Sequence, residues 1–151
     1  IRGNVPTRLP KLREGQFDAI LLAAAGLTRL EIDLSDFVVV RFNPKEFVPA
    51  PAQGVLCYQT QTNDLATRRI LQSLHDAEVA RVTNVERKIL HLLDGGCHMA
   101  LGAYCQRDSV GNYHVWAAHA ATWNSPVKRV KLSSSTQFEL AERVVEALHN
   151  G

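Results

Sequence analysis

The chain has 151 residues, of which 46% are hydrophobic, and this is enough for one ordinary globular core. Its 17 basic and 15 acidic residues leave a net charge of +2, which gives no charge field that would favour nucleic acid or a membrane surface. No apolar run approaches the about 20 residues of a membrane span. Three cysteines without a C-x-x-C pair fit a reducing cytoplasm rather than a disulfide framework.

The amino-terminal residues predict a basic helix N-terminus. A turn at Gly3-Asn4 leads into a short helix that Thr7 is expected to cap, with Pro10 in its first turn. Three cations surround this turn: Arg2, Arg8 and Lys11. Such a place binds carboxylates or phosphates, and the alternative is a solvated basic surface. Because the chain begins without Met and in mid-pattern, we expect it to be a piece of a longer protein.

Two apolar runs follow that are typical of strands. Residues 17–23 form a nearly unbroken run between Gly15 and Gly26, which predicts a strand buried on both faces of a parallel or mixed sheet. Residues 24–30 then leave the carboxyl end of that strand, where α/β sheets place their ligands, and Arg29 would join the basic cluster. Residues 37–42 predict a further strand.

Two helices are predicted next. Asn63 is expected to cap a short helix over residues 64–74, and its inward residues would be Leu65, Ile70, Leu71 and Leu74. A longer helix ends at Asp94, where Gly95-Gly96 terminates it and places Cys97 on a loop. Glycines leave room around a sulfur, and free backbone N–H groups favour a thiolate. The alternative is a helix stop followed by a half-buried cysteine.

The remaining residues predict a complete α-β-β-β-α layer that could fold alone. Strands are expected over residues 100–106, 113–122 and 127–132, with turns between them. Thr136-x-x-Glu139 reads as a capping box that opens the closing helix. Its sheet-facing residues would be Leu140, Ala141, Val144, Val145 and Leu148. The cysteines and histidines do not show the short spacing of a structural zinc site, so no metal is expected.

Several of these stretches resemble the porphobilinogen deaminase family, also called hydroxymethylbilane synthases. They occur in the family's order and near its spacing, and they span nearly the whole chain but only the latter half of the family's length. The matching motifs are Arg2-Gly3-Asn4-x-x-Thr7-Arg8-Leu9-x-Lys11-Leu12, Phe17-Asp18-Ala19-Ile20, Ala24-Ala25-Gly26-Leu27-x-Arg29-Leu30, Pro49-Ala50-x-x-Gln53-Gly54, Val82-Thr83-x-x-Glu86-Arg87 and Gly95-Gly96-Cys97.

The resemblance implies a three-domain enzyme of tetrapyrrole (haem) biosynthesis. Its first two domains are α/β and resemble periplasmic binding proteins, and its third is a small α+β domain with a three-stranded antiparallel sheet. By this matching, residues 1–46 complete domain 2, residues 47–74 return to domain 1, and residues 77–151 form domain 3. The family joins four porphobilinogen molecules into linear hydroxymethylbilane and releases ammonia, using a dipyrromethane cofactor attached to a cysteine by a thioether.

The resemblance also assigns site residues. Cys97 matches the covalent anchor, preceded by Gly96, and the matching arginines bind the acid groups of the cofactor or of the growing polypyrrole: Arg2, Arg8 and Arg29. Planar guanidinium groups suit carboxylates because they bind them in a bidentate manner. The family's catalytic carboxylate belongs to domain 1, and neither Asp18 nor Asp94 matches it. We therefore expect the catalytic acid in a missing amino-terminal segment.

Two departures from the family pattern concern the middle of the chain. Ala52 stands where the family usually has a glycine, and residues 58–61 replace a segment that often ends in an acidic residue, cysteine and arginine. Two functional hypotheses remain open. The chain is either the carboxyl-terminal part of the enzyme, inactive alone, or a divergent, non-catalytic module that binds anions.

Overall fold

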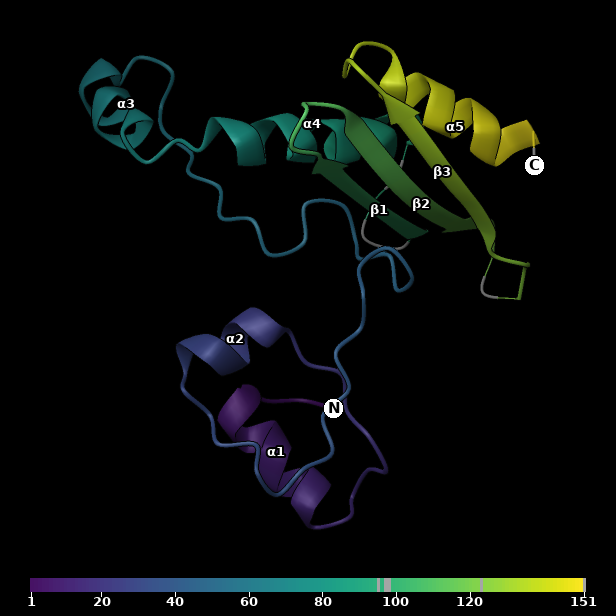
Figure 1. Ribbon diagram of the computed structural model, residues 1–151. Helices are drawn as coiled ribbons and strands as arrows, with labels where there is room; N and C mark the ends of the chain where they lie inside the picture. The colour runs from purple at the N-terminus through teal and green to yellow at the C-terminus, as the bar shows by residue number, and fades with distance from the viewer. Residues whose placement is uncertain (95, 97–98, 123, 151) are drawn as a thin grey trace. The chain divides into compact units, whose positions relative to one another are not determined.

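The computed structural model describes residues 1–94, 96, 99–122 and 124–150. The chain divides into two compact units, unit 1 over Ile1–Arg41 and unit 2 over Phe42–Gly151 (Figure 1). Among the described residues, no helix has the length and apolar character needed to cross a membrane.

Unit 1 contains two helices, α1 (Val5–Arg13) and α2 (Ala24–Arg29). Asn4 caps α1: its Oδ1 accepts the backbone N–H of Thr7 at 3.1 Å, while the Thr7 hydroxyl donates to the Asn4 carbonyl at 2.9 Å. The prediction that Thr7 is the cap is therefore wrong, because the extended backbone of Asn4 already brings a side-chain acceptor to the first free N–H groups. Since α1 begins at Val5, Pro10 lies inside the helix and not in its first turn.

The strand predicted over residues 17–23 is not present. These residues are irregular, and most of them are exposed, Leu21 to 64%. The run over residues 37–42 is likewise irregular, with Val38 exposed to 97%. A strand needs a neighbour for its backbone N–H and C=O groups, and residues 1–41 contain no strand that could pair with either run. Leu9 is the one buried apolar residue of unit 1.

Unit 2 is a small α+β layer. Its elements are α3 (Leu65–Gln72), α4 (Ala77–Leu92), β1 (Ala100–Arg107), β2 (Tyr113–Ala120), β3 (Lys128–Ser134) and α5 (Leu140–Asn150). The strands form an antiparallel sheet in the order β1-β2-β3, with Val115 of β2 opposite Cys105 and Leu132. Helices α4 and α5 pack on the sheet, α4 against β1 and α5 against β2 and β3 (Figure 1). The three predicted strands and the α+β class are thus confirmed.

The core of unit 2 lies between the sheet and these two helices. Alternate residues of each strand point toward the helices, as the period of two requires. The buried cluster contains Val85, Ile89, Leu101, Ala103, Cys105, Tyr113, Val115, Ala117, Leu140, Ala141, Val144, Val145 and Leu148. All five inward positions predicted for the closing helix are in this cluster. The predicted capping box is wrong, because Glu139 has a φ of 53° and α5 begins only after it.

Helix α3 is capped one residue later than predicted. Asp64, not Asn63, supplies the cap, and its Oδ1 accepts the Thr67 N–H at 3.0 Å. Three apolar residues predicted to face inward are instead exposed: Leu65, Ile70 and Leu74. Capping and periodicity are local and produce the helix, whereas burial needs a surface to pack against, and the core cluster of unit 2 takes no residue from α3.

Candidate functional site

Two of the cations predicted at the N-terminus of α1, Arg8 and Lys11, reach back to the backbone that precedes the helix. Arg8 donates from Nε to the Gly3 carbonyl at 2.7 Å, and Lys11 donates from Nζ to the Arg2 carbonyl at 3.2 Å. Gly3 has a φ of 112°, and a Cβ at this position would lie 2.1 Å from the Thr7 hydroxyl oxygen. Only glycine therefore allows the backbone to turn back over the helix and present its carbonyls to the two cations.

The three predicted arginines differ from Arg13 in their charge partners. Arg13 forms an ion pair with Asp36 at 3.0 Å and lies over the Phe37 ring. Arg2, Arg8 and Arg29 form no ion pair with any carboxylate that the structure describes. Arg29 lies in the last turn of α2, and no described hydrogen bond joins it to Arg2, Arg8 or Lys11. Guanidinium groups without an internal carboxylate fit a ligand that is rich in carboxylates.

Cys97, the predicted covalent anchor, lies outside the described residues, so its role stays a prediction. The helix before it ends with Leu93 as C-cap and with Asp94 at a φ of 51°. Gly96 is exposed, its carbonyl accepts the Met99 N–H at 3.1 Å, and a Cβ built on it would meet no atom within 4 Å. The space around Gly96 is therefore open within the described structure.

Cys105 behaves in the opposite way to a reactive thiol. It is 3% exposed in the core of unit 2, and burial, together with the nearby carboxylate of Glu86, raises its pKa to about 12. A thiol with so high a pKa holds its proton at neutral pH and is a poor nucleophile.

Glu86 is a buried carboxylate whose role the sequence did not reveal. Oε1 accepts the Cys105 N–H and Oε2 accepts the Ala52 N–H, each at 2.8 Å, and the residue is 6% exposed. Burial raises the pKa of this carboxyl, while the two N–H donors act in the opposite direction. Two signals in the sequence pointed to this residue: Glu86 belongs to the matching motif Val82-Thr83-x-x-Glu86-Arg87, and it is a glutamate between Val85 and Ile89 on the apolar face of a helix.

The segment before and around Ala52 lies along the edge of β1. The Ala103 N–H donates to the Pro49 carbonyl at 2.9 Å, and a Cβ on Gly102 would lie only 2.5 Å from the Val48 carbonyl oxygen. The next N–H group on this edge of β1 belongs to Cys105 and donates to Glu86. The edge strand therefore has two N–H groups with acceptors outside the sheet, those of Ala103 and Cys105. Ala52 itself has a φ of 58°, a conformation that favours glycine. The alanine that stands where the family usually has a glycine is therefore held in a strained backbone conformation.

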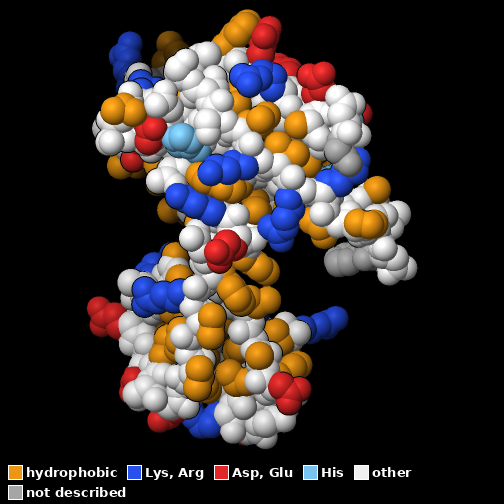
Figure 2. Space-filling view, turned by 45° about the vertical axis from the view of Figure 1, so that its right-hand side comes forward, with side chains coloured by type: hydrophobic (Ala, Val, Ile, Leu, Met, Phe, Trp, Pro, Cys, Tyr) orange, Lys and Arg blue, Asp and Glu red, His pale blue; other side chains and the backbone are white. Residues whose placement is uncertain are grey.

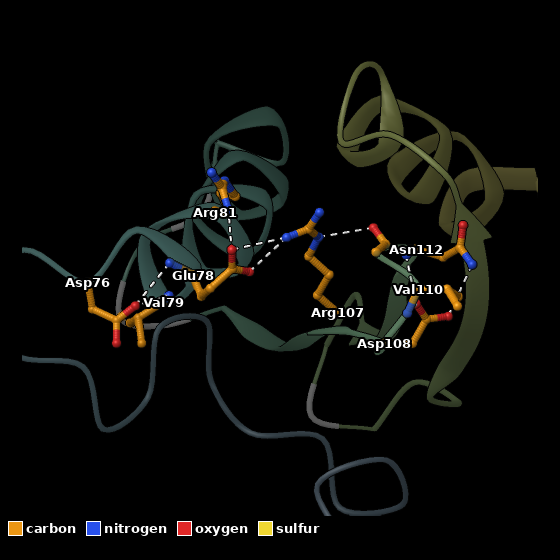
Figure 3. A network of polar contacts seen from close by, with 9 residues as sticks. Asp76, Glu78, Val79, Arg81, Arg107, Asp108, Val110 and Asn112 are labelled. Carbon is orange, nitrogen blue, oxygen red and sulfur yellow. Dashed lines mark hydrogen bonds and ion pairs between the residues drawn. The ribbon is translucent and has the colours of Figure 1, made fainter.

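We call the Glu86 carboxylate and the two N–H groups that it accepts, those of Ala52 and Cys105, the Glu86 clamp. A groove of about 490 Å³ lies beside it, between the first half of α4, β1 and the segment after Pro49. Its lining includes Val55, Val79, Val82, Tyr104 and Glu86. At one end the Arg107 guanidinium of β1 faces Glu78 of α4, with Nη1 at 3.0 Å from both carboxylate oxygens (Figure 3). No group of metal ligands is found among the residues that the structure describes.

Comparison with known proteins bears on the same residues. Residues 1–69 match the family model described as "Porphobilinogen deaminase, dipyromethane cofactor binding domain". Over 106 residues the chain is 45% identical to the porphobilinogen deaminase of Fusobacterium nucleatum, an alignment that covers 70% of the chain and 35% of that relative. The chain is therefore a relative of the porphobilinogen deaminases. The predicted resemblance is confirmed.

Other relatives extend the match. The porphobilinogen deaminase of Corynebacterium diphtheriae is 35% identical over 150 residues, which are 98% of the chain and 50% of the relative. That of an Exiguobacterium species is 36% identical over 149 residues, again 98% of the chain and 48% of the relative. The chain thus spans at most about half the length of these relatives. The matched model confirms dipyrromethane as the cofactor of this domain type, and its range contains Arg2, Arg8 and Arg29.

Proposed function

We propose that the chain is the carboxyl-terminal part of a hydroxymethylbilane synthase. The complete enzyme would join four porphobilinogen molecules into linear hydroxymethylbilane and release ammonia. The observation that carries this proposal is the match of residues 1–69 to the dipyrromethane-binding model, over a range in which three arginines have no described acidic partner. Relatives named porphobilinogen deaminase support it by matching 98% of the chain.

The arginines would bind the acid groups of the ligand. Porphobilinogen carries an acetate and a propionate, so each added ring brings two further carboxylates. In Arg8, the bond from Nε to Gly3 fixes the guanidinium and leaves its two terminal nitrogens for a bidentate carboxylate. Dipyrromethane, when bound, supplies the primer to which pyrrole units are added, and Cys97 would hold it through a thioether.

The domain assignment belongs to the same proposal. Residues 1–46 would complete a second, periplasmic-binding-protein-like domain, residues 47–74 would return to the first, and residues 77–151 would be the third. An amino-terminal segment would supply the catalytic acid, so the chain alone would be inactive. The complete enzyme would work in the cytoplasm.

The test is the intact mass of the protein encoded when the reading frame is extended upstream of Ile1. We expect an adduct of two pyrrole units that is lost in Cys97→Ser and kept in Cys57→Ser, the exposed cysteine serving as control. Ammonia should be released from porphobilinogen by the parent sequence and by Cys57→Ser, and not by Cys97→Ser. A bare protein that releases no ammonia would instead favour the non-catalytic anion-binding module.

The arginines have a matched control in the same helix. Arg8→Gln should lower the rate of ammonia release about tenfold or more, because a charge-assisted bidentate contact is lost. Arg13→Gln should have little effect, since Arg13 already pairs with Asp36. Equal losses in the two variants would show that the surface charge matters and not the position of Arg8.

A further inference from the structure

Three polar side chains form a continuous hydrogen-bonded chain in unit 2, on the sheet face that points away from the helices. Nε2 of His114 lies 3.0 Å from Oδ2 of Asp108, and Nδ1 of the same ring lies 2.7 Å from the hydroxyl oxygen of Ser133. Ser133 of β3 and His114 of β2 are direct cross-strand partners. The proposed function uses none of the three residues.

Asp108 is held in place by the turn between β1 and β2. Its Oδ1 accepts the N–H groups of Val110 at 3.1 Å and Asn112 at 2.8 Å, and Oδ2 also accepts the side-chain amide of Asn112 at 3.1 Å (Figure 3). The bond from His114, together with these bonds, holds the pKa of the Asp108 carboxyl well below its usual range. Asp108 is therefore an ionised acceptor at neutral pH.

This carboxylate decides which nitrogen of His114 carries the proton. An ionised carboxylate accepts hydrogen bonds and donates none, so Nε2 of His114 must carry the proton that it donates to Asp108. In the neutral ring Nδ1 is then an acceptor, and the Ser133 hydroxyl must donate to it. A hydroxyl, a basic nitrogen and an orienting carboxylate in this order are the parts of an activated serine nucleophile.

The surroundings provide an aromatic surface and two cations. The Trp116 ring lies 6.2 Å from the His114 ring, between centroids, and the ammonium groups of Lys45 and Lys131 lie 4.8 and 5.6 Å from the Trp116 centroid. Lys131 is two residues before Ser133 on β3 and therefore shares its face of the sheet. Figure 2 shows Lys and Arg side chains gathered near a histidine on this unit.

We propose that Ser133, His114 and Asp108 form a catalytic site that hydrolyses small carboxylic esters of aromatic alcohols. The Ser133 oxygen attacks the ester carbonyl carbon while its proton passes to Nδ1 of His114. The bond to the leaving phenolate breaks, and the phenolate takes this proton. Water then attacks the acyl-serine with His114 as base, which releases the carboxylic acid and restores the Ser133 hydroxyl. Lys131 faces the developing negative charge, and Trp116 contacts the aromatic group.

The first test is hydrolysis of p-nitrophenyl acetate by the chain of residues 1–151. Phenolate release should continue beyond one equivalent and run about 100-fold faster than in Ser133→Ala, the usual scale of general base catalysis. Ser135→Ala is the matched control and should keep the full rate, because no described hydrogen bond involves its side chain. A Ser133→Ala rate equal to that of the parent chain, or release that stops at one equivalent, would overturn the proposal.

The second test needs no variant of Ser133 and so does not depend on that variant folding. Phenylmethanesulfonyl fluoride should sulfonylate the Ser133 oxygen with loss of fluoride, and peptide mass mapping should place the adduct there. Asp108→Asn should abolish labelling while circular dichroism shows that the sheet is kept, because the orienting charge is gone. An adduct elsewhere, or none on Ser133, contradicts the assignment. Neither test involves porphobilinogen, so failure here leaves the proposed function untouched.

Discussion

The two units of this chain are ordered by different means. Unit 2 has a core of thirteen buried residues between a sheet and two helices. Unit 1 buries Leu9 alone and depends on caps, turns and polar contacts such as the bonds to the carbonyls of Arg2 and Gly3. The difference shows that a small α+β layer can bury a core from its own elements. Apolar runs such as residues 37–42 instead remain irregular and exposed, because they have no partner strand.

The largest effect should come from the core of unit 2. Ile89→Ala removes a fully buried side chain and should lower the free energy of unfolding by about 2–5 kcal/mol. Urea unfolding followed by tryptophan fluorescence measures it, since Trp116 lies on β2 of unit 2 and unit 1 contains no tryptophan. Val38→Ala in unit 1, at a residue exposed to 97%, should change it by less than about 0.5 kcal/mol. Similar effects in the two variants would contradict the contrast between the units.

The second effect concerns the Glu86 clamp. Glu86→Ala leaves the N–H groups of Cys105 and Ala52 without their acceptors and should cost unit 2 about 2–4 kcal/mol in the same urea experiment. Glu86→Gln keeps one acceptor oxygen and should lose less. Equal losses in both variants would show that packing, and not the two hydrogen bonds, makes Glu86 important.

The same carboxyl predicts a dependence on pH. Burial raises the pKa of Glu86 above its ordinary value of 4.5, so the folded state holds this proton more tightly than the unfolded state. The stability that this tighter proton binding adds is therefore complete below pH 4.5 and is lost as the pH rises through the pKa of the folded state. Glu86→Gln should flatten this part of the stability profile, and an unchanged slope would refute the assignment.

A smaller, local effect is expected in unit 1. Gly3→Ala combines an unfavourable φ of 112° with a clash against Thr7, and should destabilise the start of α1 by about 1–3 kcal/mol. Amide hydrogen exchange across α1 would report it. Gly15→Ala is the control, because its φ is 71° but no atom lies within 4 Å, so only backbone strain is added. If the control exchanges as fast as Gly3→Ala, the contact with Thr7 does not matter.

The smallest predicted change is a gain. Ala52→Gly relieves a left-handed conformation and should raise the free energy of unfolding of unit 2 by about 1 kcal/mol. Ala50→Gly, two residues earlier at an ordinary φ, should be neutral or slightly destabilising. A gain in both variants would indicate general loosening of the segment and would not support strain at Ala52.

Success of the sequence-based predictions follows the same division. The strands of unit 2 and the inward face of α5 were predicted closely, because alternation and the 3.6-residue period are visible in each segment. The helix caps were predicted at Thr7 and Asn63, whereas the structure has them at Asn4 and Asp64. The strand over residues 17–23 was wrong because strand formation depends on a distant partner that its local pattern cannot supply.

By itself, the sequence determined the type of each element in the layer that ends the chain, the basic residues at the start of the first helix, and a similarity to porphobilinogen deaminases that the comparisons confirmed. These features are carried by nearby residues, through periodicity, charge and motif. Only the tertiary structure decided that Glu86 joins Ala52 to β1, and that Asp108 and Ser133 meet on one histidine ring. Whether a polar group finds its partner depends on segments far apart in the chain, and folding alone brings them together.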